Sequence, residues 1–348
     1  MLIKVEALDT LFFRDGKPFT MGQETWADGV FPPYPSVLYG ALRSAYFAEH
    51  IAELKKANQK DDPTAGLKIK GIFLEIENDP CFPLPLDCVE EKNNESDQVA
   101  FQLKLKENTM VSSVPTPYIL DSDRNTQVEN VQGGYLNDLD FRRYLNAAMN
   151  EFYYYKLSDY VVVEEKIGIA RDRTTYTAER AKLYRITLRR LNNVSIIIDF
   201  DGLELPESGF LKLGGEGKAA AYESIKSLPS LSLELKSNRF KLYLATPAIF
   251  KNGWLPGWIN PRTLEGMYGG LRLKLLSAAV GKHVNIGGFD IEKGRPKPMR
   301  RAVPEGSVYF FELLEGEPAR VMDLMHYKCI SEYNPEQGFG ISFVGAVK

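Results

Sequence analysis

A short glycine-rich segment carries the residues best suited to bind an anion. Its sequence is Gly214-Gly215-Glu216-Gly217-Lys218. Successive glycines let backbone N–H groups approach a phosphate closely, and the lysine can neutralise its charge. The segment is not a nucleotide-binding P-loop, because Lys212 stands where that motif needs its first glycine and Ala219 where it needs Ser or Thr. A phosphate contact and a tight turn between strands are equally compatible with this pattern.

Basic residues are concentrated in two stretches of the chain. Between Arg171 and Arg190 there are seven Lys or Arg residues against two acids, and residues 165–176 are typical of one arm of a long hairpin. This arm carries Arg171, Arg173 and Tyr176. Arg pairs with phosphates, and Arg and Tyr both stack on bases. A solvated strand edge protected by charge is the alternative, but the scarcity of acids favours a nucleic-acid contact.

The second basic stretch is Arg295–Arg301, which contains four bases, two prolines and no acid. The prolines keep this segment extended, so its bases project from a loop and do not form a helix face. A solvated loop without a partner is an equally compatible interpretation.

Catalytic and metal-binding motifs are missing from the sequence. The histidines His50, His283 and His326 are far apart, and the three cysteines are too few and too scattered for a disulfide framework or a zinc site. His50 could act with a Tyr or Lys in a metal-free ribonuclease. A histidine at the negative end of a helix dipole is the simpler interpretation. We therefore predict no catalytic residue, no metal and no cofactor.

The composition limits the class of protein. The chain has 348 residues and a net charge of −3 at pH 7. This charge argues against a protein that grips long nucleic acid alone, but it allows local basic surfaces. Lys4 and Glu6 interrupt the apolar stretch that a signal peptide needs, and no uncharged apolar run approaches the length of a membrane span. We predict a cytoplasmic protein without a membrane segment.

One sequence pattern occurs twice along the chain. Leu8–Gly16 is similar to Leu244–Gly253, which has one additional residue, and each follows alternating apolar residues typical of a half-buried strand. The spacing of apolar residues predicts a helix after each copy, at Ser36–His50 and at Thr263–Val280. A glycine-rich turn ends each copy, the second at Gly338–Gly345.

This organisation predicts an α+β protein with two ferredoxin-like (RRM-like) domains in tandem, glycine-rich loops and a long β-hairpin insertion. The predicted domains are residues 1–225 and 238–348, and the boundary between them is rich in Ser and Pro. A single mixed domain with chance similarity between the two strand turns is the alternative.

Two N-terminal motifs resemble a known family. Leu11–Phe19 and Phe31–Arg43 look like the signature of a RAMP-superfamily subunit of Cmr-type (type III-B) CRISPR effector complexes, the subunit that binds the 5′ tag of the crRNA. Lys166–Arg173, Gly214–Lys218 and Arg300–Ser307 also fit, so the resemblance spans nearly the whole chain. One departure is the lysine after Gly-Gly-Glu-Gly, where arginine is expected. Lysine keeps the charge but loses the bidentate fork.

The resemblance implies a non-catalytic RNA-binding subunit. Its implied partners are the crRNA 5′ tag, the large polymerase/cyclase-like subunit and the neighbouring backbone subunit. Short single strands are read by stacking of bases and by contacts to backbone groups. The candidate RNA-binding residues are Arg14, Lys17, Arg43, Arg171, Arg173, Tyr176, Gly214, Gly215, Gly217, Lys218, Arg300 and Arg301, with Tyr39 as a weaker stacking candidate.

Two other functions stay open at this point. One is the superfamily's repeat-processing, metal-independent endoribonuclease, which would use His50. The other is a protein–protein scaffold that never contacts RNA.

Overall fold

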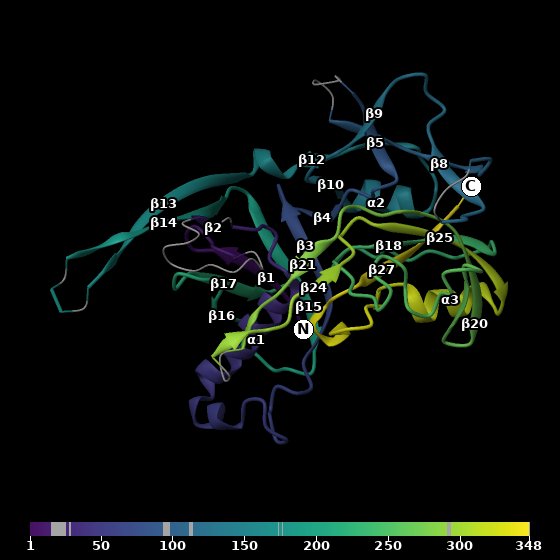
Figure 1. Ribbon diagram of the computed structural model, residues 1–348. Coiled ribbons are helices and arrows are strands. Elements are labelled where there is room, and N and C mark those ends of the chain that lie inside the picture. Colours follow the sequence, from purple (N-terminus) through teal and green to yellow (C-terminus); the bar gives the residue numbers. More distant parts are fainter. Residues whose placement is uncertain are drawn as a thin grey trace.

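Antiparallel β-strands make up most of the molecule, and they form two large sheets with few helices (Figure 1). This arrangement confirms the predicted α+β class at the level of a β-rich protein. The computed structural model describes residues 1–14, 26–27, 29–92, 98–110, 114–172, 174–175, 177–290 and 294–347.

The first large sheet has eight strands, all from residues 1–225. In spatial order they are β12 (Tyr155–Lys156), β10 (Gly134–Asn137), β4 (Asp79–Pro83), β3 (Lys68–Ile76), β15 (Val194–Asp201), β1 (Leu2–Ala7), β17 (Ala219–Ser224) and β16 (Ser208–Lys212). Every neighbouring pair is antiparallel.

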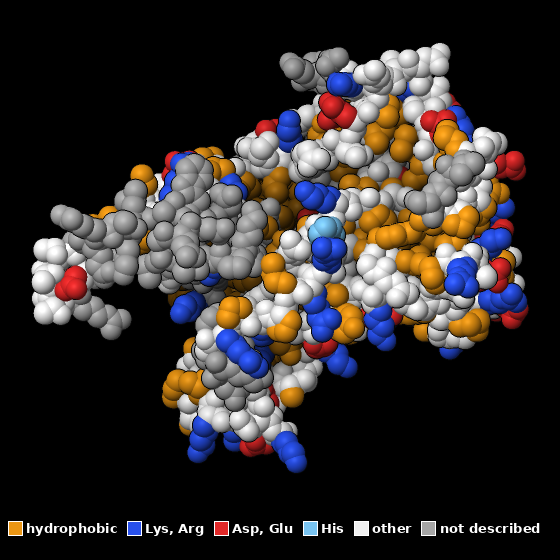
Figure 2. All heavy atoms as spheres, viewed as in Figure 1, with side chains coloured by type: hydrophobic (Ala, Val, Ile, Leu, Met, Phe, Trp, Pro, Cys, Tyr) orange, Lys and Arg blue, Asp and Glu red, His pale blue; other side chains and the backbone are white. Residues whose placement is uncertain are grey.

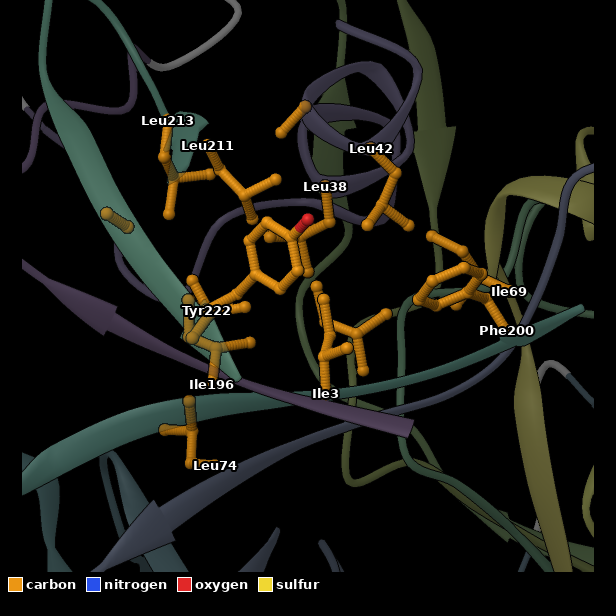
Figure 3. Close-up of a cluster of buried hydrophobic side chains, with 14 of the residues drawn as sticks. Ile3, Leu38, Leu42, Ile69, Leu74, Ile196, Phe200, Leu211, Leu213 and Tyr222 are labelled. Atoms are coloured by element: carbon orange, nitrogen blue, oxygen red, sulfur yellow. The ribbon is translucent and has the colours of Figure 1, made fainter. Parts of the chain in front are cut away.

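Helix α1 (Pro35–Glu49) packs on this sheet and confirms the helix predicted over Ser36–His50. Proline suits the first turn, where a backbone N–H would have no partner in the helix. Four of its buried residues recur at helical spacing, namely Leu38, Ala41, Leu42 and Ala45. Figure 3 shows Leu38 and Leu42 above Ile3 of the central strand β1, so the helix and the sheet share one core.

The second large sheet has six strands, all from residues 239–346. In spatial order they are β19 (Glu265–Tyr268), β20 (Leu271–Ala279), β25 (Val308–Glu315), β18 (Arg239–Leu244), β27 (Ile341–Ala346) and β26 (Lys328–Cys329). The domain limits at 225 and 238 stay a prediction, and the two sheets take their strands from either side of them.

The helix predicted over Thr263–Val280 is wrong, because this segment forms the hairpin β19–β20. Gly269 and Gly270 both have positive φ, at 57° and 87°, and they make the turn. Apolar residues four apart lie on one side of a helix, but an even spacing also puts them on one face of a strand. Leu271 and Leu275, which are four residues apart, are both buried as residues of strand β20.

The two sheets share the same order of four strands. In the first sheet the order is β3-β15-β1-β17, and in the second it is β20-β25-β18-β27. If the four strands of each half are numbered along the chain, their spatial order is second, third, first, fourth in both sheets. The first half carries α1 between its first and second strands, and the second half carries α3 (Pro318–Met325) between its third and fourth. The molecule therefore has two similar halves.

A long two-stranded hairpin projects from the first half, at the left of Figure 1. It consists of β13 (Val161–Arg171) and β14 (Ala178–Leu191), with β2 (Trp26–Ala27) along β14. It confirms the predicted hairpin arm. The remaining strands are β5 (Cys88–Glu91), β6 (Val99–Gln102), β7 (Lys104–Glu107), β8 (Tyr118–Asp121), β9 (Val128–Asn130), β11 (Glu151–Tyr153), β21 (Val284–Ile286), β22 (Phe289–Asp290), β23 (Arg295–Pro296) and β24 (Arg300–Ala302). The remaining helices are α2 (Asp138–Leu145) and the 3-10 turns η1 (Ile51–Lys56), η2 (Leu157–Asp159) and η3 (Pro335–Gln337).

A shared core joins the two halves. Phe73 and Ile197 of the first sheet belong to the same buried cluster as Phe343 of the second sheet. Strand β18 is buried on both faces, so the half-buried strand predicted there is wrong. Its Lys241 is fully buried, and Nζ donates to the Tyr144 carbonyl at 2.8 Å.

Candidate nucleic-acid interface

The glycine loop (Gly214–Lys218) connects β16 to β17 and packs against a second segment, the N-terminal turn (Asp9–Phe13). The Gly215 N–H donates to the Phe12 carbonyl at 2.8 Å. Lys218 Nζ donates to Asp9 Oδ2 at 2.9 Å and to Thr10 Oγ1 at 2.8 Å. The hydrogen bond from Lys218 is the main cause that lowers the pKa of Asp9 to about 2. The lysine charge is therefore already paired within the fold.

Two glycines of this loop have conformations that other residues adopt with strain. Gly214 and Gly217 have φ of 85° and 67°. A Cβ on Gly214 would lie 2.4 Å from the Phe12 carbonyl oxygen, whereas one on Gly217 would meet open space. The N–H groups of Gly214, Glu216 and Gly217 have no acceptor among the residues that the structure describes. The loop thus combines the close packing of a tight turn with free donors for an anion.

The base of the β13–β14 hairpin lies beside the glycine loop. Lys166 Nζ is 3.1 Å from Glu216 Oε2, and Arg190 Nη2 is 3.2 Å from Asp9 Oδ1. Arg190 also pairs with Glu164. Hairpin and loop therefore form one surface, as the hypothesis of a common RNA site requires.

The charge of this hairpin is more balanced than the sequence indicated. Arg185 pairs with Glu165, and Arg190 with Glu164, across the two strands. The prediction that Arg185 lacks a balancing acid is therefore wrong, and the side chains of Arg180 and Lys182 lie outside the described residues. The acids precede the basic stretch in sequence and face it only through strand pairing.

Several predicted RNA-binding residues of the first half lie at the edge of the residues that the structure describes, or outside them. Arg14 pairs through its backbone with Gly29, beside the N-terminal turn. Arg171 ends β13, and its side chain lies outside the described residues. Lys17, Arg173 and Tyr176 also lie outside them. Their roles stay predictions.

Arg43 has an extensive set of partners inside the fold. Its guanidinium donates to Thr64 Oγ1 at 2.7 Å, to Asn58 Oδ1 at 3.1 Å and to Asp62 Oδ2 at 2.6 Å. It also lies 6.0 Å from the centroid of the Tyr39 ring. Arg43 thus fastens residues 58–64 to α1, and the structure brings neither Arg43 nor Tyr39 into the glycine loop.

The second half repeats the contact between turn and glycine segment. Thr246 Oγ1 donates to the Gly338 carbonyl at 2.7 Å and accepts from the Ile341 N–H at 2.9 Å. The Gly340 N–H donates to the Pro247 carbonyl at 2.9 Å. This contact places residues 245–249 against the second glycine turn, as the N-terminal turn lies against the first. The similarity of the two sequence segments therefore has a structural counterpart.

Each half also has a hairpin in the same place. Leu11 exchanges two backbone hydrogen bonds with Arg189 of β14, and Ala248 exchanges two with Val303, directly after β24. The hairpin β21–β24 is thus the counterpart of β13–β14. Sequence reasoning missed this correspondence, because the two hairpins differ in length and share no motif.

The cations of the β21–β24 hairpin form a distinct basic strip. The strip consists of the exposed residues Lys282, Arg295, Lys297, Arg300 and Arg301. Within the described part of the chain none of them has an ion pair, and the Arg300 guanidinium lies 3.9 Å from the centroid of the Tyr333 ring. Figure 2 shows Lys and Arg side chains along the middle of this face, over β21 and β24. Free cations with an aromatic ring beside them suit phosphates and bases.

The groups considered for catalysis are not assembled into a site. His50 caps the end of α1, with its ring stacked 4.3 Å from the Tyr46 ring and Nδ1 3.0 Å from the Tyr46 carbonyl oxygen. Across the described residues, no group of three or more His, Cys, Asp or Glu side chains could hold a metal ion.

The fold resembles that of chains in solved CRISPR assemblies. A chain in a cryo-EM structure of the type III-B Cmr-beta bound to cognate target RNA aligns with a TM-score of 0.54 and 19% identity, over 89% of this chain and 86% of that chain. A chain of Cmr-beta bound to cognate target RNA and AMPPnP, state 1, aligns with a TM-score of 0.53 and 18% identity over the same shares. These matches define the class of fold.

The family is defined by the sequence itself. The family model of the CRISPR-associated protein Cas_Cmr3 matches residues 3–347, so the chain belongs to this family. The resemblance to a Cmr-type CRISPR subunit is thereby confirmed. No curated protein matches the chain. No helix in the described ranges is both long and apolar enough to cross a membrane.

Proposed function

We propose that this chain is a non-catalytic, RNA-binding subunit of a type III-B (Cmr) CRISPR effector complex in the cytoplasm. In this proposal it holds the 5′ tag of the crRNA and docks the large polymerase/cyclase-like subunit and the neighbouring backbone subunit. Family membership and the fold shared with Cmr-beta chains support a place in such a complex.

The basic strip is the observation that carries the RNA-binding role. Its cations have no acidic partner within the described residues, whereas Lys218, Arg185 and Arg190 are paired with acids of the chain itself. A cation that is already free can neutralise a phosphate without first breaking an ion pair. We therefore assign the primary phosphate contacts to Arg300 and Arg301.

We further propose that both halves are variants of the ferredoxin-like fold. The shared strand order supports this, with one crossover helix kept in each half. In the first half β16 takes the place of the second helix, and in the second half β19 takes the place of the first. The first half leaves its glycine loop exposed at Gly215–Gly217, whereas Gly338 and Gly340 of the second glycine turn are buried, so in the second half the hairpin is the part that RNA could reach.

The test is a salt titration of binding to tag-bearing RNA. The double variant Arg300→Ala, Arg301→Ala is compared with Arg239→Ala, Arg272→Ala, in which two exposed arginines that pair with acids are removed. Each lost phosphate contact with a single strand reduces the steepness of log K against log salt by about 0.7. We expect a reduction of about 1.4 for the first variant and none for the control. Equal slopes in both would contradict the assignment.

No observation favours the endoribonuclease, since His50 lies at a helix end and bonds to its own helix. That alternative predicts metal-independent cleavage of repeat RNA by the isolated chain, lost in His50→Ala. We expect no cleavage by either protein.

A further inference from the structure

A groove of about 120 Å³ runs between the two halves of the molecule. One wall is Val30–Pro35, which leads from the N-terminal turn into α1. The opposite wall includes Thr246 and Val284 of the second half, and Glu305 and Tyr135 also line it. The volume is small compared with pockets that hold a whole cofactor. It suits a single ring or one side chain.

The groove contains a carboxylate that the fold does not use. Glu305 is partly buried, and apart from its own backbone N–H its carboxylate has no hydrogen-bond or ion-pair partner in the described part of the chain. Burial raises the pKa of Glu305. Tyr135 is largely buried, its hydroxyl also has no hydrogen-bond partner among the described residues, and burial together with the Glu305 charge raises its pKa. Two polar groups of a largely apolar groove are thus left for a ligand.

The surroundings of the groove indicate what the ligand is. Its wall at Phe31 and Tyr34 is aromatic, with prolines between them, and such faces stack on flat rings. Val284 of the wall pairs with Ala302, so the groove adjoins Arg300 and Arg301 of the basic strip. Positive charge at this rim repels a basic protein side chain but attracts the phosphates on either side of a base.

An acid beside a phosphate chain is unfavourable unless it accepts a hydrogen bond from the RNA. Amino groups of bases are such donors, and carboxylates accept from them in known recognition. A hydroxyl can donate to the ring nitrogen or oxygen next to that amino group. Glu305 and Tyr135 together therefore complement a base edge with a donor beside an acceptor, such as the amino group and ring nitrogen of adenine.

We propose that this groove binds one base of a single-stranded RNA, and that Glu305 discriminates a base with an amino donor from a base without a donor at that position. The inference rests on the proposed RNA-binding function and adds a base-reading site to it. The strand lies with its phosphates on the basic strip and one base turned into the groove.

The test compares two RNAs that differ only in the amino group. The full chain is titrated with fluorescent oligo(A) and with the same oligomer of purine riboside, which lacks the amino group. We expect about tenfold tighter binding of oligo(A), the effect of one hydrogen bond to a charged group. Glu305→Ala abolishes this difference, and Glu305→Gln, which keeps an acceptor, retains part of it. Tyr135→Phe, which keeps the ring, reduces the difference in affinity between the two RNAs without removing it.

The outcomes separate the two proposals. Removal of an acid alone would strengthen binding of both RNAs, so equal tightening in Glu305→Ala, or equal affinities in the unsubstituted chain, overturns the base-reading site. If Arg300→Ala, Arg301→Ala still lowers the salt slope in that case, the proposed function stands. Absence of binding to either RNA overturns both. Binding of oligolysine that requires Glu305, without discrimination between RNAs, would assign the groove to a basic protein segment and overturn the inference.

Discussion

The ion pair between Asp9 and Lys218 predicts that one substitution at the site strengthens the binding of RNA. Lys218 is a phosphate candidate, yet its Nζ lies 2.9 Å from Asp9 Oδ2 and 2.8 Å from Thr10 Oγ1. The substitution Asp9→Asn removes the charge that holds this lysine and leaves its neighbours in place. If Lys218 can reach RNA, losing an acid should strengthen the binding of RNA.

The magnitude follows from one additional phosphate contact. Releasing Lys218 should steepen the dependence of log K on log salt by about 0.7. Affinity at low salt should rise by up to about fivefold, because exposed ion pairs of this kind are weak competitors. The assay is fluorescence anisotropy of tag-bearing RNA over a range of salt concentrations.

A second substitution distinguishes a freed lysine from a general loss of negative charge. In the Asp9→Asn background, Lys218→Met should return the salt slope to its original value. If Asp9→Asn leaves the slope unchanged, or Lys218→Met changes nothing in that background, Lys218 serves only to fasten the glycine loop to the N-terminal turn. The reasoning about a phosphate contact would then be wrong.

Three further substitutions test the fold. Gly214→Ala should lower the free energy of unfolding by about 1–3 kcal/mol more than Gly217→Ala. Both residues have positive φ, but only a Cβ on Gly214 meets a carbonyl oxygen. Urea unfolding measures the difference, and equal losses of stability would contradict the prediction. Lys241→Met should cost about 3–5 kcal/mol in the same assay, since it leaves the buried Asp87 carboxylate without a nearby positive charge; a loss below about 1 kcal/mol would refute this. Burial lowers the pKa of His326, so the unfolded chain takes up a proton first as pH falls below about 6.5. Stability should therefore fall with pH there by up to about 1.4 kcal/mol per unit, and His326→Gln should flatten this part of the curve.

Local patterns were sufficient for much of the architecture. Proline followed by apolar residues at helical spacing predicted α1. The duplicated Thr-containing turns predicted two similar halves, and both turns do lie against a glycine segment. The same reasoning failed for the segment Thr263–Val280, because a spacing of four residues fits one face of a strand as well as one face of a helix.

Local patterns could not predict which charged side chains form ion pairs, because pairing depends on distance in space. Arg43 looked like a phosphate ligand, but residues 15 to 21 positions away occupy its guanidinium. The acids that pair with Arg185 and Arg190 precede the basic stretch, and strand register brings them together. The second basic stretch stayed free of acids among the described residues, so its interpretation changed least.

The sequence by itself determined the family, the β-rich class, the hairpin arm and the glycine turns, because these depend on motifs and periodicities contained in short segments. Only the tertiary structure decided which of the described cations are paired with acids of the chain and which are not. It alone brought Glu305 and Tyr135 into the lining of one groove between the two halves. The physical reason is that charge neutralisation and groove formation depend on contacts between residues far apart in the chain, which no local pattern records.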